Sequence, residues 1–173
     1  GGLGEDTVHG VVTGPMPITS TFMGVETLLF TAMNPLGFTE VNLLNAHGET
    51  FVGNLGSVGD LFLSNITNGV ELGLEGQIAN SAFSFAAAEV AGLYDAATLN
   101  LKDVATVGSV TMVDIEHLNL VLDGPSYVGS MNLPHTISLS LSGQGDFSGT
   151  FSGPHAFVDA SALDGSATMI FTN

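Results

Sequence analysis

The sequence predicts an all-β fold, and an antiparallel β-sandwich of jelly-roll or meander type is the arrangement that we expect. Two observations favour it. Apolar and polar residues alternate over short runs, as in strands with one buried face. Clusters of glycine, proline, asparagine and aspartate separate the runs, and these turn signals recur about every ten residues. No linker or charge run divides the 173 residues, so we expect a single β domain over residues 1–173.

The candidate elements follow one another along the chain. Residues 25–33 are apolar on both faces and predict a buried central strand. Residues 82–92 contain three consecutive alanines and end at a glycine, so we also expect one short helix near 84–92. The remaining runs alternate with period two, and we expect strands at 70–78, 116–122, 137–142, 147–152 and 167–172.

A weak repeat offers an alternative fold. The triplets that begin at Leu99, Leu118 and Ile137 share an apolar–polar–apolar pattern and are spaced 19 residues apart. A β-solenoid repeats in this way. A meander whose hairpins are of similar length repeats in the same way and is the simpler interpretation. The β-solenoid is therefore the alternative to the sandwich.

The chain is almost without cations. It has 17 acidic residues, a single lysine (Lys102) and no arginine, which gives a net charge of −16. Such a chain cannot neutralise phosphates, so we expect no nucleic-acid partner. Its carboxylates have almost no cation to pair with inside the protein, and must be solvated, protonated, hydrogen-bonded or bound to external cations. The longest apolar stretches are shorter than the ~20 residues of a transmembrane helix, so we expect no membrane span.

No motif predicts an enzyme. The five histidines form no metal-binding pair of known spacing, no Gly-x-Ser-x-Gly turn is present, and no glycine-rich loop precedes a helix. Paired carboxylates can serve a glycosidase, but sugar sites also use aromatic platforms. The chain has no tryptophan and two tyrosines, Tyr94 and Tyr127, which also argues against a carbohydrate-binding module. We expect neither a catalytic site nor an organic cofactor.

Calcium is the ligand that the composition favours. Ca²⁺ prefers several oxygen ligands, and an acidic chain without competing cations offers many. No EF-hand loop is present. The spacing of Asp114 and Glu116 places both carboxylates on one face of a strand, so this pair is a candidate metal site. Acids on loops, such as Asp95, Asp103 and Asp123, are further candidates, and spacing does not choose among them.

The function that the sequence favours is that of an extracellular structural subunit. All-β content and the near absence of trypsin cleavage sites suit a secreted filament, pilus-like thread, sheath or surface layer. We expect copies of the chain to self-assemble into a homopolymer by β-strand addition, with calcium as a contributor. Residues 1–20 are the candidate exchanged or docking segment, and the assembly strand within them is Thr7, Val8, His9, Gly10, Val11 and Val12.

Localisation and the alternative function follow from the same features. We expect the chain outside the cell or on its surface after removal of a signal peptide, since it begins without methionine. Asn65 begins an Asn-Ile-Thr sequon and is a candidate glycosylation site. The alternative function is a soluble β-barrel or sandwich that binds an apolar small ligand among its 11 phenylalanines and 6 methionines. Pairing of residues 1–20 with their own sheet would favour such a self-contained binder over strand exchange.

Overall fold

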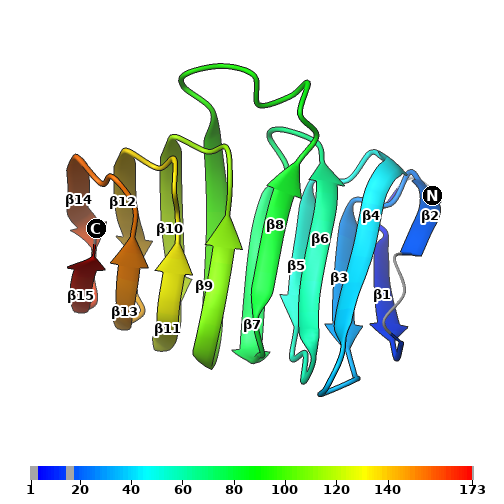
Figure 1. Ribbon diagram of the computed structural model, residues 1–173, viewed down its shortest axis with the longest axis horizontal. Helices are drawn as coiled ribbons and strands as arrows, with labels where there is room; N and C mark the ends of the chain where they lie inside the picture. The colour runs from blue at the N-terminus through cyan, green and yellow to red at the C-terminus, as the bar shows by residue number, and fades with distance from the viewer. Residues whose placement is uncertain (1–3, 15–17, 173) are drawn as a thin grey trace.

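The computed structural model describes residues 4–14 and 18–172, and these residues form a β-solenoid of about eight turns. Two parallel sheets face each other along the long axis of the molecule (Figure 1). Each turn contributes one strand to each sheet. We call the two layers the first sheet and the second sheet.

The first sheet contains β1 (Thr7–Val12), β3 (Thr27–Ala32), β5 (Phe51–Leu55), β7 (Glu71–Gln77), the first half of β9 (Ala96–Met112), β10 (His117–Asp123), β12 (Ser138–Gly143) and β14 (Phe157–Leu163). The second sheet contains β2 (Ile18–Met23), β4 (Phe38–His47), β6 (Asp60–Ile66), β8 (Ser81–Phe85), the second half of β9, β11 (Ser126–Asn132), β13 (Phe147–Ser152) and β15 (Ala167–Thr172).

The predicted antiparallel sandwich is wrong, and the alternative β-solenoid is the fold. Every strand pair among the described residues is parallel, for example β1 with β3 and β10 with β12. Alternation of apolar and polar residues correctly indicated strands, but the same alternation occurs in parallel and antiparallel strands. The turns were interpreted as hairpins, whereas each of them carries the chain to the opposite sheet. Two adjacent parallel strands require a long connection between them, and here that connection contains the strand in the opposite sheet.

The core is built from columns of identical or similar side chains that stack from turn to turn. One column of the first sheet runs through residues in direct register on successive strands, all of them buried: Leu28, Val52, Leu72, Leu99, Leu120 and Leu141. Each fully buried leucine stabilises the fold by about 1.5–3 kcal/mol relative to an exposed one. Stacking identical shapes in register therefore gives a continuous core along the whole solenoid.

Glycine is required where two turns approach each other at a corner. Gly124, Gly145 and Gly165 lie in consecutive turns after β10, β12 and β14. A Cβ on Gly145 would lie 2.1 Å from the carbonyl oxygen of Gly124, and a Cβ on Gly165 would lie 2.2 Å from that of Gly145. The backbone spacing between turns leaves no room for a side chain there.

The expected short helix near 84–92 is also wrong, because the described residues contain no helix. β8 ends at Phe85, and residues 86–95 form a loop that projects beyond the sheets (Figure 1). Ala87, Ala88 and Glu89 are exposed, so a helix here would have no apolar face to pack, and short helices need such packing. Among the described residues, no helix is long and apolar enough to cross a membrane.

Candidate functional site: an acidic corner and two open ends

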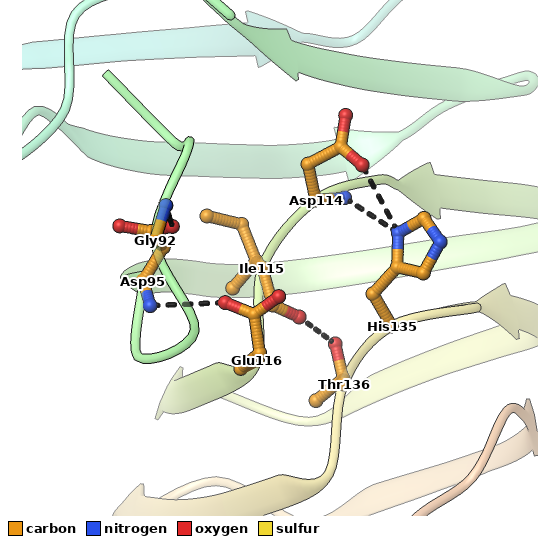
Figure 2. Close-up of polar contacts among 7 residues, drawn as sticks. All are labelled: Gly92, Asp95, Asp114, Ile115, Glu116, His135 and Thr136. Atoms are coloured by element: carbon orange, nitrogen blue, oxygen red, sulfur yellow. Dashed lines mark hydrogen bonds and ion pairs between the residues drawn. The ribbon is translucent and has the colours of Figure 1, made fainter. Parts of the chain in front are cut away.

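Asp114 and Glu116 lie in the connection between β9 and β10 rather than on one face of a strand. Asp114 has a φ of 60°, in the left-handed region, which turns the chain between the two residues. Figure 2 shows the carboxylate of Asp114 directed at His135 and that of Glu116 directed at Asp95. The two carboxylates therefore have separate partners.

The partners of Asp114 come from the next turn of the solenoid. Nδ1 of His135 lies 3.0 Å from the backbone nitrogen of Asp114 and 3.1 Å from its Oδ1. A neutral Nδ1 accepts the backbone N–H, whereas a protonated Nδ1 donates to the carboxylate. Either state links two adjacent turns at an exposed position.

Glu116 caps the neighbouring turn on the other side. Its Oε2 accepts a hydrogen bond from the backbone N–H of Asp95 at 2.9 Å. Thr136 Oγ1, one turn further on, donates to the carbonyl oxygen of Ile115 at 2.7 Å. Asp95 in turn accepts the backbone N–H of Gly92 at 3.0 Å, so this corner is held by side chains that satisfy backbone groups (Figure 2).

The same use of carboxylates recurs elsewhere in the chain. Oε2 of Glu26 accepts the backbone N–H of Asp6 at 2.8 Å, one turn earlier. Oδ1 of Asp146 accepts both the backbone N–H and the hydroxyl of Ser166 at 2.8 Å, and these two bonds hold the pKa of Asp146 below its ordinary value. Hydrogen bonding to backbone N–H groups of an adjacent turn thus stabilises carboxylates for which the described part of the chain shows no lysine partner.

Ca²⁺ binding at Asp114 and Glu116 remains a prediction. No group of three or more histidine, aspartate or glutamate side chains in the described part of the chain is arranged to hold a metal ion. A calcium titration of the wild-type chain and the Asp114→Asn variant, followed by calorimetry, tests the pair directly.

The candidate assembly strand Thr7–Val12 is β1, which pairs in parallel with β3 of the same chain. Only one edge of β1 is used in this pairing. Asn65 lies near the end of β6, with a φ of 56°, where the register between β6 and β8 shifts. Glycosylation at Asn65 and pairing of Thr7–Val12 with another copy both remain predictions.

The C-terminal end of the described chain exposes side chains that belong to the core columns. Phe171 stacks in register on Phe151, with ring centroids 5.5 Å apart. Phe151 is fully buried, whereas Phe171 is 46% exposed. In the first sheet, Val158 follows Leu139 in register, and its exposure rises from 0% to 38%.

The sequence predicted a strand at 167–172 but not the exposure of Phe171 within it. Exposure depends on whether a further turn covers β14 and β15, and periodicity within one strand carries no such information. No family model, no curated protein and no solved structure matches this chain.

Proposed function

We propose that this chain is a structural protein that elongates head to tail, with the N-terminal turn of one copy stacked on the C-terminal turn of the next. The observation that carries the proposal is that each end turn of the described chain has, in each sheet, a strand edge with which no other described strand pairs. Among the described strands, β1 pairs only with β3, β2 only with β4, β14 only with β12 and β15 only with β13.

The two ends have complementary apolar side chains. At the C-terminal end, Val158, Met169 and Phe171 continue core columns in register with buried residues of β12 and β13. Met169 is partly buried against the core. At the N-terminal end, Val8 and Val12 are partly buried hydrophobic residues packed on the same core. Stacking two copies would bury these side chains as the inner turns bury theirs.

The edges also lack the features that normally prevent pairing. Lysine, proline and inward-pointing charges protect natural edge strands. β1, β2 and β15 contain no charged residue, and β14 contains only Asp159. The carboxylate of Asp159 accepts the backbone N–H of Ser161 at 2.9 Å within its own strand.

Strand direction decides the form of the assembly. Because all strands within each sheet are parallel, a second copy in the same orientation offers β1 and β2 to β14 and β15 with matching direction. This contact joins two different surfaces, so it is heterologous and open-ended. The expected product is a filament. The proposal includes an extracellular or cell-surface location, where the scarcity of trypsin sites would be an advantage.

β1 pairs with its own sheet, so this mode of assembly is stacking of complete turns rather than strand exchange. The free edges of β1 and β2 are the parts of the N-terminal turn that take part. Net charge opposes the contact, because each copy carries −16. Added salt screens this repulsion over a Debye length of about 10 Å at 0.1 M, so filament formation should increase with ionic strength.

Sedimentation velocity at several protein and salt concentrations tests the proposal. The wild-type chain should shift from monomer to large species as either concentration rises. Phe171→Lys places a charge at the end of a core column and should block the shift. Leu93→Lys makes the same change of charge in an exposed loop and should leave the shift intact. Val158→Asp places a charge at the corresponding end of the first sheet and should also block the shift to large species.

Circular dichroism of each variant establishes that its strands are formed. A wild-type chain that stays monomeric at every concentration and salt would overturn the proposal, as would equal behaviour of folded Phe171→Lys and Leu93→Lys.

A further inference from the structure

The outward face of the first sheet has two adjoining hollows that share Glu71. The hollow nearer the N-terminal end has a volume of about 260 Å³ and includes Leu29, Phe51 and Asn100 in its lining. The second has a volume of about 190 Å³ and includes Thr98 and His117. Together they form a groove that crosses the sheet from β3 to β12, and we call it the outer groove.

Glycines create the first hollow. Leu29, Gly53, Gly73 and Asn100 stand in register on four successive strands. The two glycines leave space between the leucine and the asparagine. The ring of Phe51 packs into this space, since a Cβ on Gly73 would be 2.2 Å from Cζ of Phe51. The floor of this hollow is therefore partly aromatic, and Leu29 and Gly73 also line it.

Polar groups surround this floor. Asn100 Nδ2 donates to the carbonyl oxygen of Leu72 at 3.1 Å and lies 3.3 Å from Oε2 of Glu71. Nζ of Lys102 lies 3.0 Å from Oε1 of Glu75, and Asp123 pairs with Lys102 in register on the other side. The rim thus offers carboxylates, an amide and an ammonium group within one hollow.

The lining of the second hollow is also polar, and its polar side chains are aligned across three neighbouring strands. Thr98, Asn119 and Ser140 stand in register on β9, β10 and β12. Ser140 Oγ donates to Oδ1 of Asn119 at 3.0 Å, which leaves the Nδ2 group of Asn119 available as a donor. His117 also lines this hollow, and the exposed ring of Tyr94 stacks on it with centroids 6.0 Å apart and planes 8° apart.

We propose that the outer groove binds an extended, neutral, β-linked oligosaccharide. Flat aromatic surfaces pack against the C–H faces of pyranose rings. Carboxylate, amide and hydroxyl side chains supply the acceptors and donors that sugar hydroxyls require. A β-1,4-linked chain is itself a flat ribbon, and the outer groove extends across successive parallel strands of one sheet. The net charge of −16 disfavours anionic polymers.

This assignment revises the expectation drawn from the absence of tryptophan. Phe51 lies at one end of the outer groove, and the Tyr94–His117 stack lies at the other, so two aromatic platforms are present without tryptophan. Phe51 and His117 lie on strands of the first sheet, and Tyr94 reaches this end of the groove from the 86–95 loop by stacking on His117. The assignment is independent of head-to-tail assembly, because the groove lies on the side of the solenoid and not at its ends.

The test is a titration of ¹⁵N-labelled protein at low ionic strength with cellohexaose and, separately, chitohexaose. The two probes share the β-1,4-linked backbone and differ in the N-acetyl group. Binding of either should shift the backbone amide signals of Gly73, Asn100, His117 and Asn119. Absence of binding by both probes at millimolar concentration overturns the proposal, and so do shifts confined to the second sheet.

Matched variants test the individual contacts. Tyr94→Ala should weaken binding about tenfold, as expected for loss of one aromatic platform. Tyr127→Ala, which removes the other tyrosine from β11 of the second sheet, should have no effect. Glu71→Ala removes the exposed residue common to both hollows and should weaken binding, whereas Glu89→Ala in the exposed loop should not. The assignment would be refuted if the two tyrosine variants, once shown to be folded, bound the oligosaccharide equally well. The same holds for the two glutamate variants.

Discussion

Asn54 on β5 and Ser81 on β8 form a hydrogen bond across the core between the two sheets, with 2.5 Å from the amide Nδ2 to the hydroxyl Oγ. Both residues are buried. Asn54 occupies a column whose neighbours on both sides are apolar, Phe30 and Leu74. Its Oδ1 has no hydrogen-bond partner among the described residues, so the Ser81 hydroxyl is the partner on which the buried amide depends.

Ser81→Ala should destabilise the chain by about 1–3 kcal/mol, because it leaves the whole amide of Asn54 buried without a partner. The double variant Asn54→Leu with Ser81→Ala should recover the loss, since an apolar pair carries no unsatisfied polar group and leucine already fills position 74 of this column. Urea unfolding of the three proteins measures both effects. A Ser81→Ala variant as stable as wild type would contradict this role of the pair.

Gly145→Ala should destabilise the chain by about 1–3 kcal/mol, the usual effect of forcing an extra group into a packed site. The added Cβ would meet the carbonyl oxygen of Gly124 at 2.1 Å, and that oxygen belongs to the backbone of an adjacent turn. Gly14→Ala is the matched control, because nothing lies within 4 Å of its Cβ position. Thermal unfolding should separate the two variants, and equal midpoints would show that the corner is not close-packed.

His155 should make stability depend on pH near the C-terminal end. Its ring packs against Phe151 and Phe171, with centroids 5.9 Å and 5.6 Å away, and both ring nitrogens are buried. Burial lowers the pKa of His155 below its ordinary value of 6.5, and the Thr136 backbone opposes this to a smaller extent. The folded state therefore binds this proton less readily than the unfolded state does.

It follows that the free energy of unfolding falls as the pH decreases through 6.5. His155→Phe should lose less stability over the same range, while His47→Phe, at an exposed position, should behave as wild type. Urea unfolding on both sides of pH 6.5 measures the difference. A His155→Phe variant with the same pH dependence as wild type would exclude His155 as its source.

Glu116→Ala should destabilise the chain by about 1 kcal/mol through loss of the hydrogen bond from the backbone N–H of Asp95. Glu116→Gln keeps an oxygen acceptor and should retain most of this stability. Chemical denaturation of both variants provides the comparison. If Glu116→Ala and Glu116→Gln were equally stable, the carboxylate would not be acting as a cap.

Alternation within single strands predicted which residues are buried. Leu118, Leu120 and Leu122 share a face in the sequence and are all buried. Strand direction was not predictable in this way, because period-two alternation is the same for parallel and antiparallel neighbours. Gly53 and Gly73 likewise lie far apart in the sequence, and their hollow exists only once the strands are in register.

The repeat was detected with the wrong spacing. The sequence aligns Leu118 with Leu99 at 19 residues, whereas the structure stacks Leu120 on Leu99 and Leu141 on Leu120, at 21 residues. A slip of two residues keeps every side chain on its own face of the sheet, so the hydrophobic pattern alone could not distinguish the two registers.

Fibre diffraction combined with electron microscopy of the concentrated protein in high salt tests head-to-tail stacking most directly. Stacked copies continue the parallel sheets across each junction, so the filament should be one solenoid wide. Its diffraction should show a reflection at about 4.8 Å along the filament axis, the spacing of hydrogen-bonded strands. A uniform population of single solenoids under the same conditions would contradict the account. So would filaments whose reflection at about 4.8 Å lies perpendicular to the filament axis.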